Sequence, residues 1–91
     1  MLQVLWSEIA EKGLVRCVAP DRLEGVRKTI ELKLGLSGAV ALRRLPIFSE
    51  RQIYVFTQFI GVAVLRGVVE INGTATIWHV GTQPADSRAT E

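Results

Sequence analysis

The stretch that decides the fold of this chain is "VVEINGTATIWHV", residues 68–80. Two runs rich in β-branched residues flank Asn72-Gly73. Asn-Gly is the strongest short-range signal for a β-hairpin, because both residues tolerate the positive φ angles of a type I′ turn. A two-residue turn would place Trp78 opposite Gly67, where a large ring can cover backbone that glycine leaves bare. The sequence therefore predicts a hairpin over residues 62–80.

Both faces of this predicted hairpin carry apolar side chains, and the whole chain is apolar for its length. Hydrophobic residues make up 48% of the 91 residues, and the mean hydropathy is +0.27. A chain of this size buries only roughly 60–65% of its unfolded surface, so part of the apolar surface must lie outside the core or against a partner. Two-fold self-association needs only one self-complementary patch. We therefore expect a homo-oligomer, with a dimer favoured.

The N-terminal third of the chain predicts two helices separated by a strand. The spacing of apolar residues indicates a short helix over residues 2–12, which Gly13 would end. A partly β-branched run predicts a strand over residues 14–19. Asp21 then serves as the N-cap of a longer helix, with Glu24 completing a capping-box pair. That helix has apolar residues at three-four-four spacing and would end at a glycine: Leu23, Val26, Ile30 and Leu34, then Gly35.

The middle of the chain is compatible with more than one structure. A strand is expected over residues 39–45, closed by Pro46. Residues 49–61 combine a capping-box pair and helical spacing with many β-branched and aromatic side chains, which fit a pleated sheet better than a helix. We favour a strand over residues 52–59. A helix there would instead give the element order of a winged helix, which is the alternative fold.

Together these elements predict an α+β fold in which two helices pack on one side of a small antiparallel sheet. The sheet would have about four strands and end in the C-terminal β-hairpin. Residues 1–81 would form this single domain, and the polar, aperiodic residues 82–91 would form a disordered tail. The expected core consists of Leu5, Ile9, Leu23, Val26, Ile30, Leu34, Val40, Val55, Val64, Val69, Ile77 and Trp78.

No motif for catalysis or metal binding stands out in the sequence. His79 is the only histidine and Cys17 the only cysteine, and their spacing from acidic residues matches no known ligand pattern. A buried thiol behaves as a small hydrophobe, and the chain has no glycine-rich phosphate loop. We therefore expect a non-enzymatic protein with no metal site and no cofactor.

The sequence also predicts a cytoplasmic location. Residues 1–13 lack the basic-then-apolar order of a secretion signal, and a lone cysteine cannot form an internal disulfide. The longest apolar-biased run, residues 53–71, is interrupted by polar and charged residues too often for a membrane span. No membrane partner is expected.

Basic residues give the most specific functional hypothesis. The net charge is +2 and the isoelectric point is about 9.1. If the longer helix and the end of the next strand converge, about five cationic side chains would form one surface that tracks a phosphate backbone. The candidates are Arg27, Lys28, Lys33, Arg43, Arg44 and Arg51, of which only one of the adjacent Arg43 and Arg44 can join a given face. Exposed ion pairs with nearby glutamates offer a competing role for the same residues.

Three functional hypotheses follow from these patterns. The first is a small oligomeric accessory protein that binds nucleic acid through the basic surface. The second is a protein-interaction or scaffolding module with no nucleic-acid role, whose interface residues would be Phe56, Phe59 and Trp78. The third is a small-ligand pocket at a subunit interface, with Tyr54 and His79 as its polar contacts.

Overall fold

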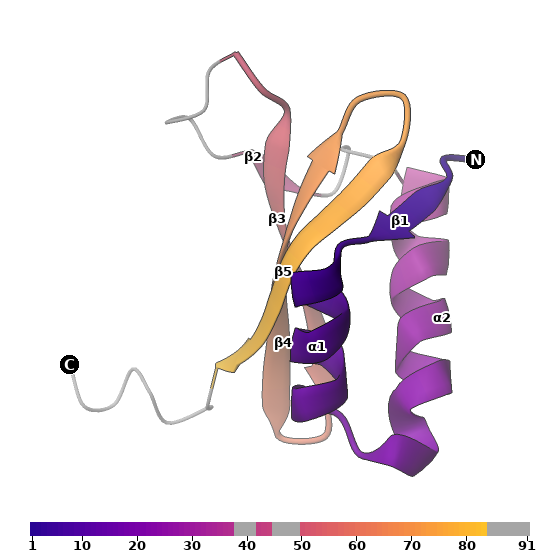
Figure 1. The fold of residues 1–91 in the computed structure, drawn as a ribbon, viewed down its shortest axis with the longest axis vertical. Helices are drawn as coiled ribbons and strands as arrows, with labels where there is room; N and C mark the ends of the chain where they lie inside the picture. Colours follow the sequence, from indigo (N-terminus) through magenta and orange to yellow (C-terminus); the bar gives the residue numbers. More distant parts are fainter. Residues whose placement is uncertain (38–41, 45–49, 84–91) are drawn as a thin grey trace, which may run out of the picture.

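A five-stranded sheet and two helices form the fold (Figure 1). The structure is a computed structural model that describes residues 1–37, 42–44 and 50–83. The strands lie in the order β1-β5-β4-β3-β2. The elements, in chain order, are β1 (Val4–Trp6), α1 (Glu8–Cys17), α2 (Pro20–Ser37), β2 (Arg43–Arg44), β3 (Ile53–Ile60), β4 (Ala63–Ile71) and β5 (Ala75–Gln83). The predicted α+β class is confirmed.

The sheet is mixed, whereas the sequence predicted an antiparallel sheet of about four strands. β1 runs parallel to β5, with Val4 beside Ala75, and the other strand pairs are antiparallel. The helix expected over residues 2–12 is therefore wrong for residues 2–7, whereas residues 8–12 are helical and begin α1. Tertiary pairing overrides local spacing here, because β5 offers this short segment a row of backbone partners.

Ser7 turns the chain from β1 into α1. Its hydroxyl accepts a hydrogen bond from the N–H of Ala10 at 3.0 Å and donates one to the carbonyl of Trp78 at 2.9 Å. α1 then packs along β5 so closely that a Cβ on Gly13 would lie 2.2 Å from the carbonyl oxygen of Val80. Gly13 therefore permits a close helix–strand contact and does not end a helix.

The strand expected over residues 14–19 is also wrong, because α1 continues to Cys17. Leu14 follows Ala10 by one helical turn, and both side chains are fully buried. The N–H of Val18 bonds to the carbonyl of Leu14 at 3.0 Å and closes the helix. Packing against β5 thus stabilises helical structure in residues 14–17, although this segment is partly β-branched.

α2 is the longer helix predicted from the three-four-four spacing. It begins at Pro20, whose missing N–H is not needed in a first turn, so Asp21 lies inside the helix and is not its N-cap. The helix also runs past Gly35 to Ser37, because Gly35 lies against the N-terminal residues and not at a turn.

Residues 53–60 form strand β3, so the winged-helix alternative is wrong and the favoured strand over residues 52–59 is confirmed. β3 pairs with β4 along its whole length, which satisfies its backbone groups without a helix. β2 falls within the strand expected over residues 39–45. Residues 39–41 and 45 of that expected strand lie outside the described residues.

β4 and β5 form the predicted hairpin, but with a longer turn. Ile71 pairs with Ala75, so the turn has three residues, 72–74. Gly73 has a φ of 78°, whereas Asn72 has no positive φ. A type I′ turn needs positive φ at both central residues, so the expected two-residue turn and its register are wrong.

A β-bulge interrupts β5 at Trp78. Val69 pairs with Ile77 and Val68 pairs with His79, which leaves Trp78 as the extra residue. A bulge of this kind opposes two residues on one strand to one on its partner and increases the local twist. Every pair beyond the bulge is consequently shifted from the predicted register.

The expected pairing of Trp78 with Gly67 is wrong as a result. Gly67 pairs with Val80 on one side and with Phe56 on the other. The Phe56 ring lies on Gly67, so a ring does cover this glycine, but it is a different ring. β5 also extends to Gln83, two residues into the segment expected as a tail, and residues 84–91 lie outside the described residues.

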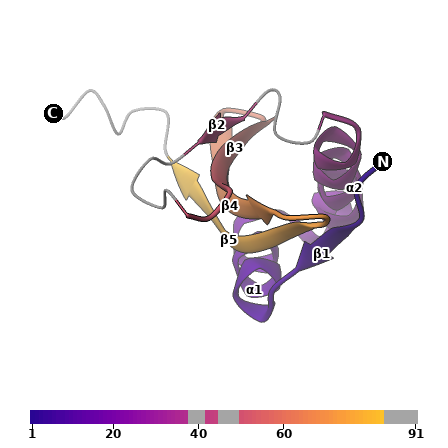
Figure 2. The ribbon, with the colours of Figure 1, turned by 90° about the horizontal axis from the view of Figure 1, so that it is seen from above.

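The core lies between the helices and one face of the curved sheet. Figure 2 shows α1 beside β5 and α2 beside β1. The expected core residues Val26, Ile30, Leu34, Val69 and Ile77 are confirmed. Further buried members that the sequence analysis did not assign to the core are Ala10, Leu14, Val18, Phe56, Leu65, Ala75 and Val80. Ile53 is also buried, but outside this cluster and in register with Glu70.

Several expected core residues lie elsewhere. Leu5, Ile9 and Trp78 are 43%, 65% and 44% exposed, because Leu5 belongs to a strand and not to a helix, and Ile9 lies on the side of α1 away from β5. Leu23 packs against the core from a partly buried position. Val55 and Val64 are half-buried outside this core cluster, and Val40 lies outside the described residues.

Candidate functional site

The face of the sheet that points away from the helices is the most distinctive surface of the molecule. Side chains alternate between the two faces of a strand, and Phe56, Leu65 and Val69 point into the core. Their neighbours point the other way, and of these only Phe59, at the end of β3, lines a hollow shared with α2, where Arg22, Gly25 and Thr29 are among the lining residues. We call this surface the helix-free face, with described members Ile53, Val55, Thr57, Phe59, Val64, Arg66, Val68, Glu70, Thr76, Trp78 and His79. Arg43 of β2 is in register with Val55 at its edge.

Two aromatic side chains are exposed on the helix-free face. Phe59, near the end of β3, is 73% exposed, and Trp78 is 44% exposed. The apolar side chains of Val55, Val64 and Val68 are half-buried on the same face. Exposed apolar surface marks interaction sites in soluble domains, and here the exposed Thr57–Arg66 pair lies between the two rings.

Trp78 is held in place by a chain of polar contacts. Its Nε1–H donates to Oε1 of Glu70 at 3.1 Å. Glu70 also accepts two hydrogen bonds from Arg51, which precedes β3, through Nε at 3.1 Å and through Nη2. The side chain of Glu70 is only 19% exposed, whereas that of Arg51 is 54% exposed. The indole is therefore fixed to a charged pair that belongs to the same sheet face.

The Arg51–Glu70 pair shifts the titration of both groups. The hydrogen bond from Arg51 is the largest cause that holds the pKa of the Glu70 carboxyl below its usual range, and burial acts in the opposite direction. The same hydrogen bond and the charge of Glu70 raise the pKa of the Arg51 guanidinium. Glu70 is thus an anion at neutral pH and a hydrogen-bond acceptor for Trp78.

Arg27, one of the six predicted nucleic-acid-binding residues, is engaged inside the domain. It pairs with Glu11 of α1 and lies over the ring of Trp6, 5.1 Å from the ring centroid. Trp6 in turn donates its Nε1–H to Oε2 of Glu31 at 2.8 Å. This cluster joins β1, α1 and α2, so Arg27 has a structural role that competes with phosphate binding.

The other predicted basic residues lie on several different elements. Arg51 is bound to Glu70, and Lys33 donates to the carbonyl of Thr57 at 2.6 Å. Lys28 is exposed on α2 and forms no ion pair within the described part of the chain. Arg43 and Arg44 pair through their backbones with β3 residues Val55 and Tyr54, at the opposite end of the strand order from β1.

Phe56, the third predicted interface residue, belongs to the core. It is 1% exposed and lies against Gly67 on the helix side of the sheet. Phe56 and Phe59 are three positions apart in one strand, and an odd spacing places two side chains on opposite faces. That spacing was a signal in the sequence that could have separated the two residues.

The helix-free face also contains polar residues that the sequence analysis did not assign to a site. Arg66 and Thr57 face each other across β4 and β3, and both are exposed. Glu70 was not named either. Alternation along β4 divides its residues into two sets, but only the placement of the helices decides which set is covered.

Tyr54 and His79, the predicted contacts of a small-ligand pocket, lie on opposite faces of the sheet. Tyr54 packs against the core cluster and donates its hydroxyl hydrogen to Gln52 at 2.8 Å. His79 pairs with Val68 and is exposed on the helix-free face. These two side chains therefore do not line a common pocket within one copy of the chain.

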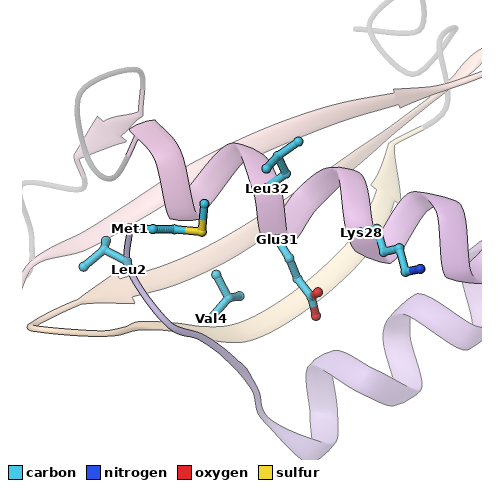
Figure 3. A pocket seen from close by; sticks show the side chains of 6 residues that line it. All are labelled: Met1, Leu2, Val4, Lys28, Glu31 and Leu32. Atoms are coloured by element: carbon cyan, nitrogen blue, oxygen red, sulfur yellow. The ribbon is translucent and has the colours of Figure 1, made fainter.

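A hollow of about 320 Å³ lies between the N-terminal residues and α2 (Figure 3). It is lined by Met1, Leu2, Val4, Lys28, Glu31 and Leu32. Ligand sites usually bury most of the ligand surface, whereas Met1 and Leu32 at this hollow are themselves exposed. Glu31 already accepts the hydrogen bond from Trp6, so the hollow has few polar groups available to orient a ligand.

Residues suited to metal binding do not cluster in the described part of the chain. No group of three histidine, cysteine, aspartate or glutamate side chains comes together within residues 1–37, 42–44 and 50–83. Cys17 is half-buried, with its Sγ 3.9 Å from the hydroxyl of Thr82. Neither described helix has both the length and the apolar character needed to cross a membrane.

Searches against protein families, curated proteins and solved structures return no match for this chain. Function must therefore be inferred from its own side chains. The helix-free face is the surface where exposed apolar groups, an oriented indole and a cation come together.

Proposed function

We propose that this protein is a small non-enzymatic module that self-associates through the helix-free face. The observation that supports this most strongly is the exposure of Phe59 and Trp78 beside three half-buried valines on one sheet face. At the exposed fractions given above, the two rings present roughly 250 Å² to water. Pairing two copies would remove about twice that area, which is about a quarter to two fifths of the roughly 1,200–2,000 Å² that a specific interface buries.

The charges on this face favour a protein partner over nucleic acid. Arg51 and Glu70 compensate each other, and Arg66 forms no ion pair with another described residue. Affinity for nucleic acid grows with the number of phosphates that a surface neutralises, and Arg66 together with Arg43, which is in register with Val55, would supply two such contacts. Interface cores between proteins are instead depleted in charge and enriched in aromatic residues and arginine.

A second copy of the chain is the partner that this proposal names, and a dimer is the expected oligomer. Two-fold association needs only one self-complementary patch, and the helix-free face offers two exposed rings on either side of the exposed Thr57–Arg66 pair. Two sheets pack face to face at a spacing of about 10 Å with their strands nearly aligned. Such packing would cover both Phe59 rings and both Trp78 rings.

Light scattering coupled to size-exclusion chromatography tests this proposal. The mass of the full chain is expected to rise from monomer towards dimer as the loaded concentration increases from about 1 µM to about 1 mM. Phe59→Ser is expected to shift this transition to higher concentration. Leu36→Ser is the matched control, because Leu36 is 66% exposed on α2, away from the sheet face.

A monomer mass at every concentration would contradict self-association. Loss of the dimer in Leu36→Ser, with retention in Phe59→Ser, would contradict the choice of surface. Both outcomes are read from the same chromatograms.

Binding of single-stranded nucleic acid is the second candidate, favoured by Arg66 and His79 on the same face as the exposed rings. Bases stacked on aromatic side chains contribute about 1–3 kcal/mol each. This candidate predicts retention on an oligonucleotide column that weakens with salt and with Arg66→Ala. Replacing Arg43, Arg44 and Lys28 tests the basic surface named from the sequence. Retention that is unchanged between low and high salt would exclude both versions.

A further inference from the structure

The outer edge of β3, on the side away from β4, is paired over only part of its length. Within residues 1–37, 42–44 and 50–83, β2 covers this edge at Tyr54 and Val55 alone, so residues 56–60 have a strand partner on one side only. Leu42, which precedes β2, packs against the core cluster and does not extend the ladder.

The backbone groups that point out of this open edge belong to Thr57 and Phe59. Alternate residues of a strand direct their N–H and C=O groups to the same neighbour. The carbonyl of Gln52, just before β3, accepts a hydrogen bond from the N–H of Ile71 on β4 at 2.9 Å, so the even-numbered residues face β4. The N–H groups of Thr57 and Phe59 therefore face outward, where the described residues offer them no acceptor.

Side chains occupy the two outward carbonyls. Nζ of Lys33 on α2 donates to the carbonyl of Thr57 at 2.6 Å, and Nε2 of Gln58 donates to that of Phe59 at 3.4 Å. Lysine commonly protects an open strand edge from pairing, so Lys33 by itself indicates protection. The space beside the edge is the observation that indicates a binding site.

A hollow of about 350 Å³ separates the end of β3 from the first half of α2. Arg22, Gly25 and Thr29 line it from the helix, and Gln58 and Phe59 line it from the strand. A Cβ on Gly25 would meet no atom within 4 Å, so the helix wall leaves room for a side chain. An open strand edge and a hollow that can take side chains thus lie next to each other.

We infer that this groove binds an extended, acidic peptide segment of another protein, which adds to the outer edge of β3 as a further strand. The peptide backbone pairs with Thr57 and Phe59, and one of its side chains enters the hollow beside Gly25. A peptide N–H takes the carbonyl of Thr57, and the released ammonium of Lys33 pairs with the acidic side chain. This site is separate from self-association through the helix-free face.

The charges of the groove favour an acidic segment. Lys33 bonds to a neutral carbonyl, and Arg22 forms no ion pair with another described residue. Asp21 also lines the hollow and offsets one of these two charges. One cation therefore remains without a counter-charge, and Lys33 is the cation that strand addition would release.

The wall formed by α2 favours an isolated segment over a folded second copy. Lys33 reaches from α2 to the carbonyl of Thr57, so the helix and the edge lie within one side-chain length of each other. A single added strand needs only about 4.8 Å beside β3. The edge of a second copy would bring its own α2 into the same space.

Titration of the isotope-labelled chain with three matched peptides, at one fixed protein concentration, tests this inference. The probe is acetyl-Thr-Val-Glu-Val-Thr-amide. The second peptide has glutamine in place of glutamate, and the third has N-methyl groups on its three central amides. The probe is expected to move the amide protons of Thr57 and Phe59 downfield and to bind about two- to fivefold more tightly than the glutamine peptide. The N-methylated peptide is expected not to bind.

Filling the hollow tests its part in binding. Gly25→Leu is expected to weaken binding of the probe at least about tenfold, while leucine raises the helix propensity of α2, so the loss does not come from unfolding. Glu24→Leu is the matched control, because Glu24 is the neighbouring exposed position and does not line the hollow. The control is expected to bind the probe as the wild type does.

Removal of the ammonium group tests the preference for an acid. Lys33→Met keeps most of the side chain and is expected to abolish the preference for glutamate over glutamine. Lys28→Met is the control, because Lys28 is exposed on α2 and does not line this hollow. It is expected to leave the preference unchanged.

Four results would overturn the inference. These are no shift at Thr57 and Phe59 with any peptide, equal binding of the N-methylated peptide, equal loss in Gly25→Leu and Glu24→Leu, and a preference for glutamate that survives Lys33→Met. A peptide affinity that falls as the protein concentration rises would place a second copy in the groove and overturn the choice of occupant.

Discussion

The Phe56 ring lies so close to Gly67 of the neighbouring strand that a Cβ atom on residue 67 would approach its ring carbons to 2.2 Å. Phe56 is among the largest fully buried side chains of the core. The absence of a side chain at Gly67 therefore lets the Phe56 ring occupy the space where a Cβ atom would lie. This contact fixes which face of β3 is buried and so leaves Phe59 on the other face.

Gly67→Ala is expected to lower the free energy of unfolding by about 2–3 kcal/mol, because the Phe56 ring has to leave its position in a packed core. Urea denaturation measures this change. In a Phe56→Leu background, the cost of Gly67→Ala is expected to be smaller, since the two residues are in direct contact. Equal costs in both backgrounds would show that the ring is not the obstacle.

Gly25→Ala is expected to raise the free energy of unfolding by about 0.5–1 kcal/mol. Gly25 lies inside α2, and a Cβ there would meet no atom within 4 Å. Alanine would lower the conformational entropy of the unfolded chain without disturbing a contact. A destabilised variant in the same urea titration would mean that α2 packs against something at this position.

Ser7→Ala is expected to lower the free energy of unfolding by about 1–2 kcal/mol. The substitution removes both the cap on Ala10 and the hydrogen bond to the Trp78 carbonyl. Ser7→Thr keeps a hydroxyl and should recover most of the loss. Thermal unfolding of the three chains measures the difference, and an unchanged midpoint for Ser7→Ala would contradict this role.

Stability is expected to fall in acid through Glu70. Its pKa is lower in the folded chain than in the unfolded chain, so its contribution is complete above the unfolded pKa. That contribution is lost as pH falls through the folded pKa. The free energy of unfolding should therefore decline between about pH 5 and about pH 3, and Glu70→Gln should make this decline shallower.

Glu24→Gln is the control for this titration, because Glu24 is an exposed carboxylate on α2 with no ion pair among the described residues. Its decline with pH should match that of the wild type. The same slope in wild type and Glu70→Gln would show that the Arg51–Glu70 pair does not contribute to stability.

Local patterns in the sequence predicted α2 and the hairpin but not the N-terminal elements. The apolar spacing of α2 is long enough to be unambiguous, and Asn72-Gly73 marks a turn whatever its length. β1 has only three residues, so alternation cannot be distinguished there from helical spacing. Its strand conformation depends on pairing with β5, about seventy residues later in the chain.

The candidate site was predicted only in part for a similar reason. Phe59 and Trp78 were named because their apolar character exceeds what a short chain can bury, and both are exposed. The bulge that moves His79 to the same face has no signature in the local sequence. Arg27 and Arg51 were assigned to a basic surface, because the glutamates that bind them lie 16 and 19 positions away in the chain.

Concentration-dependent amide chemical shifts of the isotope-labelled chain test the central claim most directly. Spectra recorded from about 10 µM to about 1 mM are expected to show shifts concentrated at Thr57–Phe59, Val64–Val68 and Trp78–His79, the strand segments that form the helix-free face. Shifts confined to α2, or none at all over this range, would contradict self-association through the helix-free face.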